Sequence, residues 1–222
     1  MEAVALGGAG LLLLGGIAWY FSKSTDPTAV VILTSTQSGK IPFNSSASLP
    51  RSFNQAEGAT FSYEGWFDVN DFTYGFGTKR VIFNHGDCPG MYLDTTSNSV
   101  LVTIATYGAT ESILIENIPA QKWIHFAIVV TQYTVDIYIN GILRQHHTLT
   151  QLPKQTDIAT VVGSSTNGFD GEVGGLTYYS RSLSQLEVSA HAMASPPPSL
   201  VREPASGQYF DTTWYTGRYN IG

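Results

Sequence analysis

The segment from Trp123 to Leu149 constrains the fold more than any other part of this 222-residue chain. Trp123 to Val130 is a nearly continuous run of aromatic and β-branched residues, which is typical of a strand buried on both faces. From Thr134 to Asn140, apolar and polar residues alternate, which indicates a strand with one face in the core. Asn140-Gly141 fits the two positive-φ positions of a type I′ turn, and a strand from about Ile142 to Leu149 follows. The segment therefore predicts three consecutive antiparallel strands.

Charge and cysteine content exclude several classes of protein. Charged residues make up 13% of the chain, the net charge is −6, and no basic run is present, so a nucleic-acid-binding surface is not expected. Abundant glycine and aromatic residues fit an all-β domain and argue against disorder. The single cysteine, Cys88, excludes an internal disulfide and favours a reducing compartment. No nucleophile motif surrounds it, so we expect a structural free thiol.

Residues 1–22 are expected to form a transmembrane anchor. Ala3 to Phe21 carries no charge and would span roughly 28 Å as a helix, close to the ~30 Å hydrocarbon core of a bilayer. The apolar centre of this segment and the aromatic residues at its end, which would lie at the headgroup level, are Leu11, Leu12, Leu13, Leu14, Trp19 and Tyr20.

A cleaved signal peptide is the alternative interpretation of the same segment. Glu2 stands where a basic residue would be expected, and aromatic residues occupy the cleavage position, so the uncleaved anchor is favoured. Lys23 follows the apolar segment, and the positive-inside rule then leaves the large domain on the cytosolic side.

The remainder of the chain divides into a linker at 23–28, a β domain at 29–194 and a proline-led tail at 195–222. Short strand patterns separated by glycine, proline and asparagine predict about ten to twelve strands, and only one of them is expected in the loop-rich stretch from Thr34 to Glu57. Ser184 and Glu187 form a capping box that begins a helix from Gln185 to about Ala192. We expect the tail to dock on this domain or on another subunit through its rings, which are Tyr209, Phe210, Trp214, Tyr215 and Tyr219.

Three pieces of the chain, in this order, resemble the laminin-G-like or concanavalin-A-like jelly-roll family. They are FSYEGWF from Phe61, the Trp123 strand with DIYINGIL after it, and GFDGEV from Gly168 with LTYYSRSLS following. The resemblance covers roughly Val30 to Ala194. It implies an all-β, two-sheet antiparallel jelly-roll sandwich, here preceded by one transmembrane helix. It does not fix the function, because this fold hosts lectins, hydrolases, adhesion modules and structural proteins.

Candidate catalytic and metal sites are sparse. A glycoside hydrolase needs two carboxylates roughly 5 Å apart, yet Glu64 with Asp68, and Asp170 with Glu172, stand as isolated pairs. We therefore expect no enzyme activity and no cofactor. The resemblance implies a calcium site at a sandwich rim, for which Asp170 is a weak candidate.

Sugar binding remains open at an aromatic loop. Tyr74 and Phe76 lie in the glycine-rich stretch Asp71–Lys79, and with Asn84 they could stack on a sugar ring and bond its hydroxyls. Loop aromatics of this kind equally cap a sandwich edge or meet a protein partner.

Two functional classes follow from these features. The first is a structural protein that contacts a lipid bilayer and other subunits of a large assembly, and in this respect the chain resembles membrane-associated minor capsid proteins of large icosahedral DNA viruses. The domain would then face the capsid side of a virion membrane. The alternative is a membrane-anchored carbohydrate-binding or adhesion module.

Overall fold

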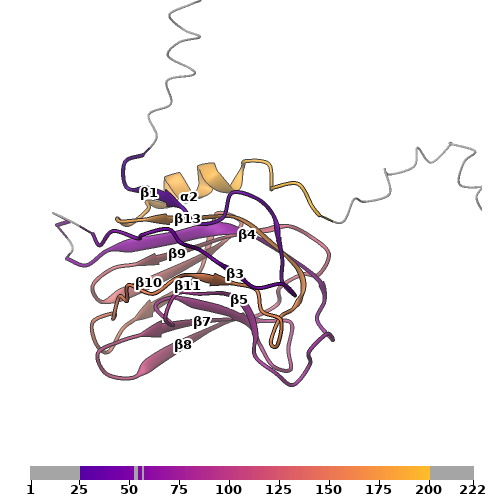
Figure 1. The fold of residues 1–222 in the computed structure, drawn as a ribbon. Coiled ribbons are helices and arrows are strands. Elements are labelled where there is room, and N and C mark those ends of the chain that lie inside the picture. Colours follow the sequence, from indigo (N-terminus) through magenta and orange to yellow (C-terminus); the bar gives the residue numbers. More distant parts are fainter. Residues whose placement is uncertain (1–25, 53–54, 57, 201–222) are drawn as a thin grey trace, which may run out of the picture.

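Two antiparallel sheets pack face to face in the computed structural model, which describes residues 26–52, 55–56 and 58–200 (Figure 1). The strands are β1 (Ala29–Val31), β2 (Gln37–Ser38), β3 (Phe43–Asn44), β4 (Phe61–Asp71), β5 (Arg80–Asn84), β6 (Gly90–Leu93), β7 (Val100–Ala105), β8 (Thr110–Ile115), β9 (Ile124–Val130), β10 (Thr134–Ile139), β11 (Ile142–Thr148), β12 (Val161–Val162) and β13 (Asp170–Tyr179). One helix, α2 (Gln185–Ala192), is present in the described part. The two-sheet antiparallel sandwich expected from the sequence is confirmed.

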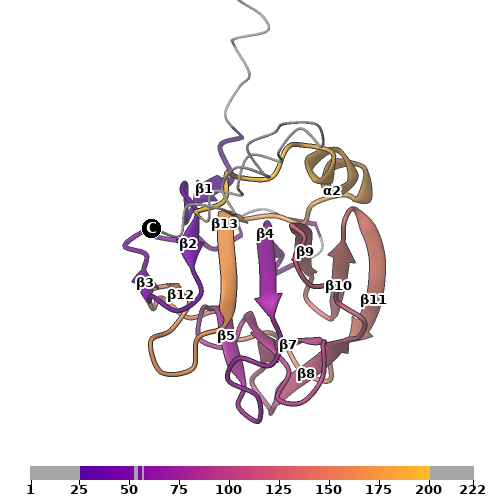
Figure 2. The same cartoon turned by 90° about the vertical axis from the view of Figure 1, so that its right-hand side faces the viewer.

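Strand order explains which loops meet at each end of the sandwich. The seven-stranded sheet runs β1-β13-β4-β9-β10-β11, with β2 also paired to β13 (Figure 2). The six-stranded sheet runs β3-β12-β5-β6-β7-β8. The strands β2 and β3 lie where the sequence predicted only one short strand. Their hydrogen-bond partners are β13 and β12, which are far away in sequence, so local pattern gave no sign of the second strand.

The central hairpin forms as the sequence predicts. Every residue of β9 is buried, and the alternating β10 directs Val135, Ile137 and Ile139 into the core between the sheets. Asn140 and Gly141 have φ of 50° and 78°, which are the left-handed values that a type I′ turn requires. The turn thereby fixes the register of β11, whose residues are almost all exposed because it is the edge strand of its sheet.

Stacked aromatic rings join the two sheets across the core. Phe83 of β5 stacks on Tyr63 of β4 with ring centroids 5.7 Å apart, and on Phe126 of β9 at 5.6 Å. All three side chains are no more than 1% exposed. Each buried ring of this size contributes about 2–3 kcal/mol of hydrophobic free energy, so the aromatic residues provide much of the stabilisation of the sandwich.

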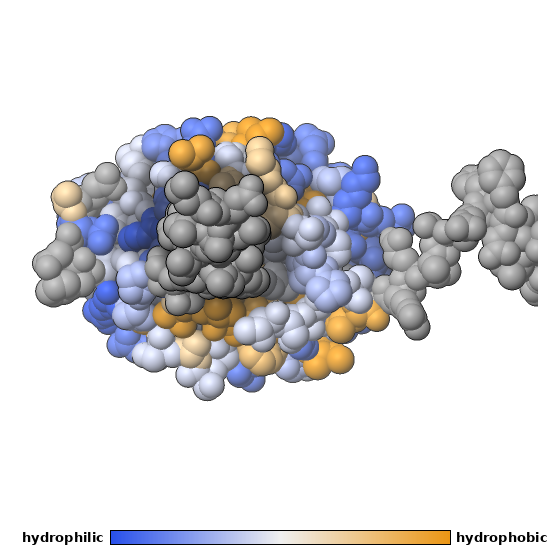
Figure 3. All heavy atoms as spheres, turned by 90° about the horizontal axis from the view of Figure 1, so that it is seen from above, coloured by the Kyte–Doolittle hydropathy of each residue, from blue (hydrophilic) through white to orange (hydrophobic). Residues whose placement is uncertain are grey.

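Helix α2 covers the outer face of the seven-stranded sheet, on the side that Figure 1 shows at the top. The predicted capping box is confirmed, since the Ser184 hydroxyl accepts from the Glu187 amide and the Glu187 carboxylate accepts from the Ser184 amide. Val188 is the buried anchor of the helix. The surface on this side is a mosaic of hydrophobic patches among hydrophilic residues (Figure 3), and Leu186 and Met193 are 80% and 86% exposed.

The chain after α2 crosses the same outer face as a short strap, Ser195–Leu200. Thr36 donates to the Pro198 carbonyl at 2.5 Å, and Pro197 packs where Gly174 of β13 leaves room. The Ser199 hydroxyl and the Leu200 amide donate to Glu172 at 2.7 and 3.0 Å. Residues 197–200 of the predicted tail therefore contact the sandwich.

Two expectations fall on residues that the structure does not describe. The predicted anchor, with Leu11, Leu12, Leu13, Leu14, Trp19 and Tyr20, lies outside the described ranges, as do the tail rings Tyr209, Phe210, Trp214, Tyr215 and Tyr219. Among the described residues, no helix has the length and apolar character needed to cross a bilayer.

Candidate functional site

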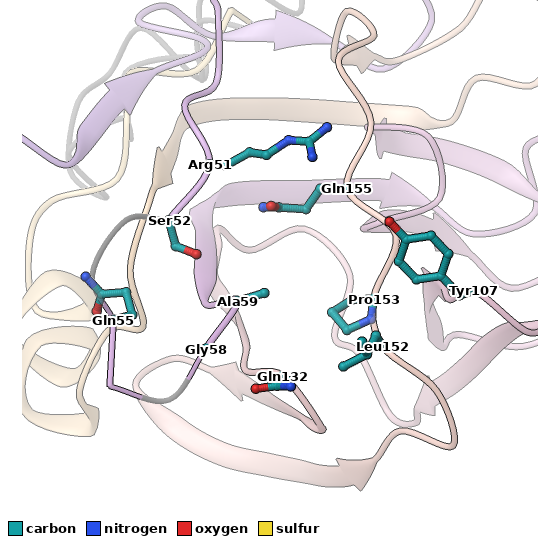
Figure 4. Close-up of a pocket in the computed structure, with 10 residues that line it drawn as sticks. All are labelled: Arg51, Ser52, Gln55, Gly58, Ala59, Tyr107, Gln132, Leu152, Pro153 and Gln155. Atoms are coloured by element: carbon teal, nitrogen blue, oxygen red, sulfur yellow. The ribbon is translucent and has the colours of Figure 1, made fainter.

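A pocket of about 470 Å³ opens at the end of the sandwich where β4 begins (Figure 4). This volume lies within the ~300–1,000 Å³ range of small-molecule sites in proteins. Four connections meet here: those from β3 to β4, β7 to β8, β9 to β10, and β11 to β12. The residues that line this end pocket are Arg51, Ser52, Gln55, Gly58, Ala59, Tyr107, Gln132, Leu152, Pro153 and Gln155.

Tyr107 forms one wall of the end pocket and is 71% exposed. Its backbone is held firmly, because its amide donates to the Leu152 carbonyl at 3.0 Å and its neighbour Thr106 forms a β-bridge with Pro153. The Thr106 hydroxyl also closes the turn, accepting from Gly108 and donating to Ala109 at 3.1 and 2.6 Å. The exposed ring is therefore presented on a fixed turn, which limits the entropy lost when a ligand stacks on it.

The floor and the opposite wall come from the β9–β10 turn and the loop before β4. Gln132 lies in a turn that is fixed by Thr131 and Thr134, whose hydroxyls are 2.7 Å apart. Gly58, at φ +80°, packs so closely that a Cβ on it would lie 2.1 Å from the Gln132 Oε1 atom. Figure 4 shows Ser52 and Gln55 on the side of the pocket opposite Tyr107, Leu152 and Pro153, while the Arg51 side chain extends from the Ser52 side toward the β11–β12 connection, near Gln155.

Arg51 is the charged residue of the end pocket, and none of the described lining residues is acidic. Its guanidinium lies 3.4 Å from Asp157, and the two side chains are 62% and 80% exposed. An ion pair this long and this exposed contributes at most about 1 kcal/mol, so a ligand can displace it. The pocket thus combines one cation, several amide and hydroxyl groups, and one exposed aromatic ring.

The sugar-binding candidates Tyr74 and Phe76 lie at the other end of the sandwich. Their loop follows β4, and the eleven residues of that strand place it roughly 33 Å from the end pocket. Tyr74 and Phe76 are 43% and 62% exposed, and the Lys40 ammonium lies 4.4 Å from the centroid of the Tyr74 ring. The fully buried Arg80 holds the loop by donating to the carbonyls of Phe72 and Tyr74.

Asn84 does not join these two aromatic residues. It lies at the far end of β5 from the loop, about 13 Å from Arg80 along the strand. Its Oδ1 atom accepts from the Asp87 amide at 2.7 Å, which stabilises the turn that follows β5. The structure therefore does not bring Tyr74, Phe76 and Asn84 together as one site.

Asp170, the weak calcium candidate, forms an ion pair with Lys40 at 2.9 Å. That ammonium would have to move before a cation could bind. Among the described residues, no group of three or more His, Cys, Asp or Glu side chains has the arrangement of a metal site. His146 and His147, which the sequence places on opposite faces of β11, contact different carboxylates, those of Asp136 and Glu111.

A buried polar cluster lies under α2 on the outer face of the seven-stranded sheet. Glu64 accepts from the Tyr179 hydroxyl at 2.5 Å and contacts the Nδ1 atom of His191 at 2.8 Å. His125 lies 3.9 Å from the same carboxylate and packs edge-on against Trp66. Burial, with a smaller effect from His191, lowers the pKa of His125 to about 4, so this imidazole is neutral at pH 7. The contacts of Glu64 with Tyr179 and His191 therefore hold helix α2 on the sheet.

Cys88 is a buried free thiol, as expected. Burial raises its pKa to about 12, so it stays protonated and unreactive at neutral pH.

The sandwich with a pocket at one end places this chain among the lectin-like jelly-roll proteins, and sequence comparison agrees. A profile of the concanavalin A-like lectin/glucanases superfamily matches residues 19–189, and the chain belongs to this family. No curated protein sequence matches the chain significantly.

Solved structures with the same fold include the binding domains of bacterial toxins. The botulinum neurotoxin serotype D binding domain matches at a TM-score of 0.55 with 15% identity, over 74% of this chain and 46% of the toxin domain. The binding domain of Paraclostridial mosquitocidal protein 1 matches at 0.56 with 13% identity, over 75% and 45%. The serotype D domain in complex with N-acetylneuraminic acid matches at 0.54 with 13% identity, over 77% and 43%. The chain thus spans less than half of these domains, and the likeness concerns the fold.

The end pocket was not predicted from the sequence. Arg51, Gln132 and Gln155 stand in loops that are far apart in the sequence and that carry no shared motif. Gly108 after Tyr107 is a local turn signal, but nothing in the sequence marks the Tyr107 ring as part of a site.

Proposed function

We propose that this chain is a non-catalytic carbohydrate-binding module and that the end pocket is its sugar site. The observation that carries this proposal is the exposed Tyr107 ring, held on a hydrogen-bonded turn at a pocket whose other lining residues include amide, hydroxyl and guanidinium groups.

The chemistry of the pocket suits a sugar. Sugar rings present a patch of C–H groups that stacks on an aromatic face, and hydroxyls that need both donors and acceptors. Ser52, Gln132 and Gln155 supply groups of both kinds. Leu152 and Pro153 extend the apolar surface beside Tyr107.

Catalysis is not part of the proposal. Glycoside hydrolysis requires two carboxylates, about 5–5.5 Å apart in retaining enzymes and about 6.5–9.5 Å apart in inverting ones. None of the described residues that line the end pocket is Asp or Glu. The two buried carboxylates described above have other contacts: Glu64 is bonded to Tyr179 and His191 beneath α2, and Glu172 accepts from Ser199 and Leu200 of the strap.

The related folds support the class of function without naming the ligand. The similar structures reported above are binding domains, and one of them is described in complex with N-acetylneuraminic acid. None of these similar structures is a capsid protein. They therefore favour a carbohydrate-binding module over a capsid component.

Titration of the full chain with a panel of monosaccharides and oligosaccharides tests the proposal. Tyr107→Ala is expected to weaken saccharide binding by roughly two- to ten-fold, because stacking on an aromatic face contributes about 0.5–1.5 kcal/mol. Tyr74→Ala is the matched control, since it removes an exposed tyrosine at the opposite end of the sandwich. Loss of binding in Tyr74→Ala with retention in Tyr107→Ala would place the site in the aromatic loop instead.

A structural role through protein contacts is the second candidate, and one observation favours it. The edge strand β11 is exposed along nearly its whole length, and with β8 it borders a groove of about 460 Å³ that includes Leu114, Ile142 and Leu143. An edge strand without proline is a template for pairing with another chain. A full chain that binds no saccharide but self-associates in sedimentation experiments would support this role.

A further inference from the structure

The charged side chain among the described residues that line the end pocket is a cation, in a chain whose net charge is negative. The chain has a net charge of −6, yet Arg51 is the charged group among the described lining residues. A net negative charge on the chain disfavours an acidic ligand, and Arg51 offsets this at the pocket. The guanidinium can donate to the hydroxyls of any sugar, but only a carboxylate gains the additional strength of a charge-assisted pair.

Arg51 is available for a ligand. Its side chain is 62% exposed, and its hydrogen bond to Asp157 is long, at 3.4 Å. A sugar carboxylate can replace this contact with two parallel hydrogen bonds to the same guanidinium, which is the geometry that arginine and carboxylate groups favour. Asp157 itself is 80% exposed, so it remains hydrated after the exchange.

Different residues of the pocket would contact the charged group of a sugar and the face of its ring. Ser52 lies on the side opposite Tyr107, Leu152 and Pro153, and the Arg51 side chain extends toward the β11–β12 connection, near Gln155 (Figure 4). A sugar whose ring stacks on Tyr107 would direct another part of the ring toward Arg51. A carboxylate on that part would reach the guanidinium without losing the stacking contact.

We propose that the end pocket selects sugars that carry a carboxylate, namely uronic or sialic acids, with Arg51 as the residue that determines this specificity. This inference rests on the proposed carbohydrate-binding function and adds the class of ligand. Arg51 pairs with the carboxylate, Tyr107 stacks on the ring, and the amide groups of Gln132 and Gln155 bind the remaining hydroxyls.

The test compares ligands that differ only in charge. Methyl glucuronoside and the methyl glycoside of N-acetylneuraminic acid are titrated into the full chain beside their methyl esters, which keep the shape and lose the charge. At least one of the acids should bind about ten- to a hundred-fold more tightly than its ester, the range expected for charge-assisted hydrogen bonds. Arg51→Gln should remove this difference, and Arg51→Lys should retain part of it.

Three further outcomes distinguish failure of the carboxylate preference from failure of the proposed carbohydrate-binding function. Equal binding of acid and ester, or equal weakening of both by Arg51→Gln, overturns the carboxylate preference and leaves a neutral-sugar site. A sulfated glucoside that binds as tightly as the glucuronoside overturns it in favour of general anion binding. Absence of binding to every saccharide overturns the proposed function together with the inference.

Asp157→Asn is a second variant, which is expected to strengthen binding of the acidic sugar, whereas Arg51→Gln weakens it. It releases Arg51 from its partner and removes a negative charge beside the pocket. Binding of the preferred acid should become severalfold tighter, while binding of its ester stays the same. Weaker binding of the acid would contradict the role given to Arg51. Both positions are exposed, so neither variant is expected to disturb folding.

Discussion

At the scale of single residues, His125 shows how burial sets a charge state. The side chain is enclosed between Trp66 and Glu64, with His191 of α2 close by, and its Nδ1 atom has no hydrogen-bond partner among the residues that the structure describes. Burial keeps its pKa near 4 in the folded chain, while an unfolded histidine titrates near 6.5. At a pH between these two values, the imidazole of His125 binds a proton in the unfolded chain but stays neutral in the folded chain.

Acidification from pH 6.5 to 4 should therefore destabilise the fold, and His125 should account for a defined part of the loss. Its contribution is on the order of 3 kcal/mol, fully present above pH 6.5 and lost by about pH 4. Replacing this histidine, as in His125→Gln, should flatten the pH dependence of the free energy of unfolding in that window. Urea titrations at a series of pH values measure it, and parallel curves for the variant and the wild type would show that His125 titrates normally.

Gly141 is constrained twice, by its own backbone and by α2. Its φ is 78°, and a Cβ on it would lie 3.1 Å from the Cα atom of Ser189 and 3.2 Å from the Cβ atom of Ala192. Gly141→Val should lower the free energy of unfolding by more than about 1 kcal/mol, because a β-branched residue resists positive φ. Chemical denaturation gives the value.

Gly77→Val is the matched control for this substitution. Its φ is 86°, but nothing lies within 4 Å of the added Cβ, so this variant suffers the backbone strain alone. A larger loss in Gly141→Val than in Gly77→Val would report the contact with α2. An unchanged unfolding midpoint in Gly141→Val would mean that the β10–β11 turn is not as described.

At the scale of elements, Arg181 fastens the first strand to the last helix. Its guanidinium donates to Asp26, just before β1, and to Glu187 in α2, at 2.6 and 2.7 Å. Burial alone would raise the pKa of Asp26, but hydrogen bonds from Thr28 and Arg181 outweigh it and lower that pKa to about 2. The hydrogen bond from Arg181 likewise lowers the pKa of Glu187 to about 2.

Carboxyl groups with lowered pKa stabilise the fold above their unfolded pKa of about 4, and this stabilisation is lost as the pH falls toward 2. Arg181→Met should therefore cost about 1 kcal/mol at pH 7, which lowers Tm by ~2–4 °C, and should cost little at pH 2. Thermal melts at both pH values test this. Arg51→Met, which breaks only an exposed pair, is the control, and an equal loss in both variants would contradict a specific role for Arg181.

Structural elements could be predicted from the sequence where the interactions that form them join residues close together in the chain. Asn140-Gly141 and the capping box of Ser184 and Glu187 each act within a few residues, and both form as predicted. The strand β2 and the end pocket depend instead on segments that only the folded chain brings together, such as Gln37 beside Val173. Tyr74 and Phe76 could be proposed as a site because they lie in one short segment of the sequence, whereas the residues that line the end pocket come from four connections.

At the scale of the whole molecule, the sandwich is a rigid frame with two distinct ends. One end carries Tyr74 and Phe76, in a loop tied down by Arg80 and beside Lys40. The other end carries a pocket whose walls rest on β4, β7 and β9 through short turns. The outer face of the seven-stranded sheet between these ends is covered by α2 and the strap, and the concave surfaces described above are the end pocket and the groove between β8 and β11.

The most direct test of this account is to map where a saccharide binds on the full chain by the amide chemical shifts of its backbone. An acidic sugar such as methyl glucuronoside should shift the amides of Tyr107, Gln132 and Gln155 and leave those of Tyr74 and Phe76 unchanged. Shifts confined to the aromatic loop, or to the edge strand β11, would contradict a sugar site at this end of the sandwich.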